Sequence, residues 1–345
     1  MIKKEDFIKL LDEEDMDGIY KLVKRGISTD FFSIKNYKGC TALYIASERN
    51  NIELVKLLLE KGADVNGESM GKNTALHIAS EKNNLFIANY LLKKGANVDA
   101  RNARNETPLF KSCRINLIKM TKLLLDNGAN PNITDITGKS ALFPVCFFGF
   151  YEIAKLLINA NIDLNITDLD NVTALELACW DGFIDIVKLM VENNADLNIK
   201  IKGEDILKWA IEREEYELVD MLVKKDAKLP IRWIIKENKK EALRIIINNK
   251  KHIPLIYENV DILAEAISRN NIEIVNLLMK NISNDLDYKI EKLREMLSTT
   301  RADNILENSH EGTKKKIKML KREREREEIV DILCVRQNAK LRRKI

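Results

Sequence analysis

The stretch TALYIA at Thr41–Ala46 returns 33 residues later as TALHIA at Thr74–Ala79. Shorter versions follow at the same interval, at Thr107–Leu109, Ser140–Leu142 and Thr173–Leu175. A fixed period of roughly 20 to 50 residues is typical of a stack of identical units, none of which buries its apolar face alone. The sequence therefore predicts a solenoid rather than domains with one central core each.

One repeat, from Asn36 to Asn66, can be interpreted residue by residue. Thr41 stands where a helix should begin, and its hydroxyl can accept hydrogen bonds from the first backbone N–H groups. A short apolar helix, a polar break over residues 48–51 and a second helix over residues 52–61 follow, with apolar side chains at helical spacing. Gly62 then stands where a left-handed backbone ends the helix.

The same stop recurs at the period of the repeat. It is Gly95, Gly128, Asn161 and Asn194 in the later copies, and Asn is the residue that tolerates a left-handed backbone best after Gly. A short extended segment follows each stop. The predicted unit is therefore helix, turn, helix and hairpin.

These residues resemble the ankyrin repeat, which has a period of about 33 residues and the signature T-P-L-H-x-A. The resemblance implies an all-α solenoid with about nine or ten repeats, including degenerate ones. Only Thr74 and His77 supply the Thr–His pair of that signature. Pro144 falls within the first turn of its helix, where a missing N–H costs least.

We expect one solenoid over residues 1–345. Its parts are a capping repeat (4–38), five clear repeats (39–203), degenerate repeats (204–285) and a degenerate basic repeat or cap (286–345). Within the degenerate part, Leu229–Lys250 is predicted to be a shortened helix pair. A further helix is predicted over Tyr288–Leu297, and Thr313–Leu341 is interpreted as the last repeat.

The composition is that of a soluble, folded chain, with 45% hydrophobic and 32% charged residues. The N-terminus has no apolar run, so a cleavable signal peptide is not expected. The longest uncharged apolar stretch, Ala141–Tyr151, is too short to span a bilayer. A cytoplasmic location, or export without a cleavable signal, and a monomeric state are expected.

Cys113, Cys146 and Cys179 are also spaced by 33 and could suggest a disulfide column or a metal site. Packed helices lie about 8–10 Å apart, which is too far for a disulfide. Ser47 and Ser80 occupy this position in the two preceding repeats, so we expect a buried small side chain instead. No catalytic or phosphate-binding motif is present, and no enzyme, cofactor or metal is predicted.

The resemblance implies a protein–protein interaction scaffold that binds through its hairpin tips and its concave face. At the exposed ends of the first helices the outer repeats carry charged residues, whereas the middle ones carry apolar and aromatic residues. Stacked side by side, these predict an apolar patch with a charged rim, the usual anatomy of a binding hot spot. The alternative is that Phe147 or Phe148 turns inward. The candidate contact residues are Phe147, Phe148, Trp180, Ile115, Arg114, Asp181, Ile136, Leu169, Tyr37 and Arg104.

Two other functions are considered. Residues 313–345 carry 13 Lys and Arg against 5 Asp and Glu, which could attract nucleic acid or an anionic surface. Alternating charges over residues 322–328 and the absence of aromatic residues after Tyr288 favour a solvated helix over this reading. The chain could also be a regulatory or inhibitory subunit of a separate enzyme.

Overall fold

The computed structural model describes residues 4–36, 38–249, 256–257, 260–262, 265–266, 269 and 271–281 of the chain. The chain is predominantly helical and divides into two compact units, Met1–Ile201 and Lys202–Ile345. Each unit is described by itself.

The first unit contains the predicted succession of helix pairs. In each clear repeat, a helix of seven or eight residues is followed by one of nine residues. The helices are α1 (Lys4–Asp12), α2 (Met16–Arg25), α3 (Ala42–Glu48), α4 (Ile52–Glu60), α5 (Ala75–Glu81), α6 (Leu85–Lys93), α7 (Pro108–Arg114), α8 (Ile118–Asp126), α9 (Leu142–Phe148), α10 (Tyr151–Asn159), α11 (Ala174–Asp181) and α12 (Ile184–Glu192). The connecting segments hold η1 (Thr29–Ser33), η2 (Met70–Lys72) and strand β1 (Lys200–Ile201).

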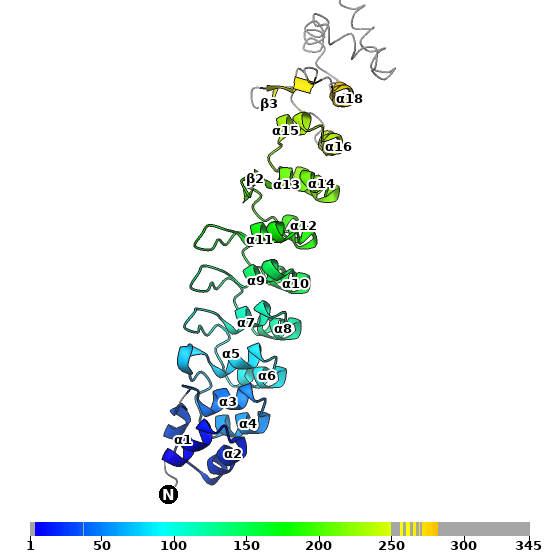
Figure 1. Cartoon of the computed structure of the whole chain (residues 1–345). Helices are drawn as coiled ribbons and strands as arrows, with labels where there is room; N and C mark the ends of the chain where they lie inside the picture. The colour runs from blue at the N-terminus through cyan, green and yellow to red at the C-terminus, as the bar shows by residue number, and fades with distance from the viewer. Residues whose placement is uncertain are drawn as a thin grey trace, which may run out of the picture. The chain divides into compact units, whose positions relative to one another are not determined.

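The helices of this unit form two rows. The first helices pack on one another in order from α3 through α5, α7 and α9 to α11, and the second helices do the same from α2 to α12. Figure 1 shows the pairs stacked in chain order, with the loops before α7, α9 and α11 projecting from one side. Side chains such as Leu76, Leu91 and Met120 are fully buried between neighbours. Each repeat thus buries its apolar face against the next, as the period requires.

The predicted helix stops are confirmed. Gly62, Gly95 and Gly128 have φ values of 92°, 85° and 84°, and Asn161 and Asn194 have 58° and 65°. A second set of left-handed residues lies in the turn between the two helices of each repeat. These are Asn50, Asn83, Asn116, Gly149 and Gly182.

A ladder of Asn and Asp side chains ties each repeat to the next. The Oδ1 of Asn66 accepts the backbone N–H of Asn97 at 2.7 Å, and the Oδ1 of Asp99 accepts that of Asn130 at 2.9 Å. The next two rungs have the same form, from Asp163 to Asn132 and from Asp196 to Asn165. Each rung spans 31 residues, two fewer than the period, so it joins a residue of one repeat to the next repeat at two positions before the equivalent residue.

His77 also joins two repeats and has a structural role. Its Nδ1 accepts the backbone N–H of Thr74 at 3.1 Å, so Nε2 carries the proton and donates it to the carbonyl of Glu106 at 3.0 Å. The ring is fully buried, and this burial lowers the pKa of His77 to about 4. The imidazole is therefore neutral at physiological pH.

The second unit continues the pattern of helix pairs. Its elements are β2 (Glu204–Asp205), α13 (Ile206–Glu212), α14 (Tyr216–Lys224), α15 (Ile231–Lys236), α16 (Lys240–Asn249), β3 (Ile256–Tyr257), β4 (Val260–Asp261) and α18 (Ile272–Asn281). The predicted shortened pair over 229–250 corresponds to α15 and α16. Strands β3 and β4 pair antiparallel, with Tyr257 opposite Val260. The predicted helix over 288–297 and the predicted last repeat over 313–341 lie outside the described residues. The total of nine or ten repeats and the single solenoid over 1–345 stay predictions.

Candidate functional site

The first helices end at one common edge because they begin at equivalent residues. Thr41, Thr74, Thr107 and Thr173 are their N-caps, and each hydroxyl accepts the backbone N–H of the residue three positions later. Helix α9 begins at Leu142 without a side-chain cap. With starts in register and nearly equal lengths, residues 33 apart at the helix ends lie in neighbouring repeats.

The aromatic patch, defined as Ile115, Phe147, Phe148 and Trp180, lies at this edge of three successive repeats. The exposed fractions of these four residues are 43%, 52%, 50% and 39%. The rings of Phe147 and Phe148 meet edge to face at 4.9 Å, and Phe148 stacks on Phe150 at 5.5 Å. These ring contacts fall in the range of favourable aromatic pairs, so they hold the side chains in defined positions.

Phe147 and Phe148 do not turn inward. The residues of α9 that pack into the core are instead the neighbouring Val145 and Cys146, which are fully buried. Cys113 and Cys179 are equally buried, as the small-residue interpretation expects, and none of the three thiols forms a disulfide. Burial raises the pKa of Cys113 to about 12, which leaves its thiol protonated and unreactive.

Arg114 and Asp181 are the two candidate residues predicted to lie at the rim of the patch. The Nη1 of Arg114 lies 2.8 Å from a carboxylate oxygen of Glu106, whose side chain is buried. The same carboxylate accepts a bond from Asn102 at 2.9 Å, and Lys111 lies 3.9 Å from it. Arg114 is therefore held by an internal ion pair, whereas Asp181 is exposed at the end of α11.

The hairpin tips form a separate surface. The backbone N–H of Ile136 donates to the carbonyl of Arg104 at 3.0 Å, and that of Leu169 donates to Thr137 at 3.0 Å. Ile136, Leu169 and Arg104 are all exposed. The tips precede the first helices, whereas the patch lies at their C-terminal ends, about 10 Å further along the helix axis. Tyr37, the other tip residue predicted to contact a partner, lies outside the described residues.

Several exposed apolar residues were missed. Ile118 and Tyr151 begin the second helices α8 and α10, directly after the turns that follow the patch residues, and both are more than a third exposed. Their spacing of 33 residues is the pattern by which the sequence could have identified them. Phe86 is the most exposed large apolar residue among those described, at 85%, and stands in a repeat outside the patch.

Other kinds of site have little support in the described part of the chain. No group of three or more His, Cys, Asp or Glu side chains there is arranged to bind a metal. Among the helices that the structure describes, none is long and apolar enough to cross a membrane. The basic segment 313–345 lies outside the described residues.

Comparison with known families identifies the repeat. The family model for ankyrin repeats (three copies) matches residues 11–102, 99–168 and 145–232. A comparison with curated proteins finds no match. The family matches cover more than half of the 345 residues and fall on the stacked helix pairs described above. The chain therefore belongs to the ankyrin repeat family.

Proposed function

We propose that this protein is a protein–protein interaction scaffold and that the aromatic patch is its principal contact surface. Ankyrin repeats generally mediate protein–protein interaction, and the family is typically a non-enzymatic scaffold. The observation that carries the proposal is the exposure of Phe147, Phe148 and Trp180 at one edge of consecutive repeats. Exposed aromatic residues grouped in this way are typical of interaction sites.

The energetic argument rests on desolvation. Each aromatic side chain can bury a large apolar area against a partner, and Trp is among the residues most enriched in binding hot spots. The rings already contact each other, so little conformational freedom is lost on binding. Asp181 provides an exposed charge at the rim of the patch.

The hairpin tips are proposed as a second contact surface. Ile136 and Leu169 are 57% and 76% exposed, and Arg104 lies at the neighbouring tip. Backbone hydrogen bonds between consecutive tips keep them in register. A partner that contacts both the tips and the patch would lie along the first helices.

The test is the double variant Phe147→Ala/Trp180→Ala in the full chain. Affinity capture followed by quantitative mass spectrometry should show binding proteins of the wild type reduced by about tenfold or more, as expected for hot-spot truncation. The midpoint of thermal unfolding should fall by less than about 3 °C, because Phe147 and Trp180 are 52% and 39% exposed and lie outside the fully buried core.

Phe86→Ala is the matched control, since it removes an exposed aromatic ring outside the patch. It should leave the captured proteins unchanged. Capture that is unaffected by the double variant would contradict the proposal. A fall in the unfolding midpoint of about 10 °C would instead assign both residues to the core.

A further inference from the structure

The second unit contains two adjoining pockets that are each lined by more basic than acidic residues. They measure about 520 and 450 Å³, and both are lined by Lys236 and Arg269. We propose that they form a groove for an acidic segment of a protein partner. This proposal rests on the proposed function as a protein-binding scaffold. The groove is distinct from the aromatic patch because its residues all belong to the second unit.

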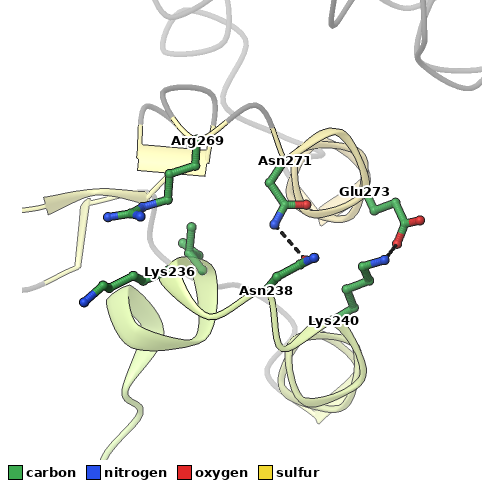
Figure 2. A pocket seen from close by; sticks show the side chains of 7 residues that line it. Lys236, Asn238, Lys240, Arg269, Asn271 and Glu273 are labelled. Atoms are coloured by element: carbon green, nitrogen blue, oxygen red, sulfur yellow. Dashed lines mark hydrogen bonds and ion pairs between the residues drawn. The ribbon is translucent and has the colours of Figure 1, made fainter.

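The fold aligns the basic side chains of the groove. Arg232 and Lys236 are four residues apart in α15, so they project from the same face of that helix. Arg269 comes from the segment before α18. Figure 2 shows Arg269 and Lys236 extending in the same direction, with their charged ends on the same side of the pocket.

The positive charge is uneven along the groove. In the larger pocket Lys240 forms an ion pair with Glu273, and Asn271 donates to the Oδ1 of Asn238 at 2.7 Å (Figure 2). The smaller pocket is lined by four basic side chains and a single carboxylate, that of Asp205. The four basic residues are Lys228, Arg232, Lys236 and Arg269. An anionic ligand is therefore favoured in the smaller pocket.

Nearby carboxylates do not remove this preference. Glu265 lies 2.7 Å from the Nε of Arg269, which uses one of the five N–H donors of the guanidinium. Glu237 lies 4.0 Å from the Nζ of Lys236, at the outer limit of an ion pair, and both side chains are about half exposed. The Lys236–Glu237 pair is exposed, so it contributes little and can be exchanged for a ligand carboxylate, while the other N–H donors of Arg269 can still reach a ligand.

The wall of the smaller pocket also has an apolar part. It consists of Leu229, Pro230, Ile231 and Trp233. Lys208 lies 5.1 Å from the centre of the Trp233 ring and covers it. An acidic segment with an apolar side chain fits a wall of this composition.

The charge pattern favours a short acidic segment over a nucleic acid. Between residues 202 and 249 the sequence has 11 Lys and Arg against 10 Asp and Glu, so the excess is local to the pocket. Nucleic acids are usually bound by a basic stripe that follows the backbone, with several aromatic rings for stacking. The smaller pocket has one indole ring, which already carries Lys208.

The test measures binding of the labelled peptide EELEE to the full chain by fluorescence anisotropy, with KKLKK as the charge-reversed probe. EELEE should bind with an affinity that decreases as salt increases, and KKLKK should not bind. Arg232→Glu/Lys236→Glu should raise the Kd by about tenfold or more. Arg232→Gln/Lys236→Gln should raise it less, because it removes the charges without reversing them.

Lys93→Glu/Lys122→Glu is the matched control, since it changes the net charge equally at exposed positions of α6 and α8. It should leave the Kd within about twofold. Circular dichroism should show the same fold for all variants. Binding of EELEE should also change the intrinsic fluorescence, and Trp233→Phe should abolish that change.

Three results would overturn the proposal: absent binding of EELEE, equal losses in the two charge-reversal pairs, or tighter binding of a single-stranded DNA of equal charge at the same residues. These outcomes are separable from the proposed function. If capture of protein partners still depends on Phe147 and Trp180 while EELEE does not bind, only the groove is rejected. If EELEE binds through Lys236 and no partner depends on the aromatic patch, the patch is rejected instead.

Discussion

The imidazole of His77 is held neutral between two repeats. It accepts the N–H of Thr74 at the start of α5 and donates to the carbonyl of Glu106 in the next repeat. At the equivalent position of α11, the carboxylate of Glu176 likewise accepts the N–H at the helix start, that of Thr173, at 2.7 Å. The position therefore requires an acceptor, and histidine adds the second contact.

This arrangement predicts a pH-dependent stability. The folded pKa of His77 is about 4 and the unfolded value is about 6.5, so only the unfolded state takes up a proton between these values. Stability is complete above pH 6.5 and should fall by about 2 kcal/mol between pH 7 and pH 5. His77→Gln keeps an acceptor at the helix start and should flatten this dependence in urea unfolding. An unchanged slope in that variant would assign the effect to other groups.

At the scale of one element, the helix ends are governed by single left-handed residues. An added Cβ on Gly95 meets no atom within 4 Å, although φ is 85°. Gly95→Ala should therefore destabilise by about 1–2 kcal/mol through backbone strain alone, and Gly95→Asn by less. Gly149→Ala should cost more, because its Cβ would lie 2.4 Å from the ring of Phe183. Urea unfolding of the three variants measures this order, and equal costs for Gly95→Ala and Gly149→Ala would contradict it.

The sequence predicted the elements well because their signals are local. Caps, stops and apolar spacing all lie within one repeat, so the helix pairs of the first unit and the left-handed residues follow from the period. The exposure of Phe147 and Trp180 followed from comparing columns across repeats. Binding by these residues stays a prediction.

Side-chain hydrogen bonds and ion pairs were not predictable in this way, because a polar side chain can pair with any of several neighbours. Arg114 was predicted at the rim of the patch, but its ion pair with Glu106 was not predicted. Several carboxylates lie within reach of such a side chain, and the period does not select one. The Asn and Asp ladder was missed for a similar reason, since the extended segments identify the residues but not the neighbours that they contact.

At the scale of the whole molecule, each repeat of a stack is stabilised by contacts with its adjacent repeats only. Leu91 is fully buried in α6, and Leu91→Ala should cost about 2–5 kcal/mol locally. In single-tryptophan variants that keep Trp180 or Trp233, urea unfolding reports the first or the second unit. We expect Leu91→Ala to lower the midpoint seen by Trp180 more than that seen by Trp233.

Leu91→Met is the control, because it keeps the volume and should shift both midpoints little. Equal shifts at both reporters after Leu91→Ala would mean that residues 1–345 unfold as one cooperative block. That result would favour the single solenoid expected from the sequence. Unequal shifts would agree with two compact units.

The ladder between repeats has a consequence for how the gene can change. Each rung joins an Asn or Asp oxygen to a backbone N–H, and that donor is present whatever residue occupies the next position. Loss of residues 97–129, one full period, would bring Asn130 opposite Asn66 and restore the same hydrogen bond. Recombination within the repeats can therefore add or remove whole repeats without breaking the ladder. The length of the binding surface can then differ between variants of the gene.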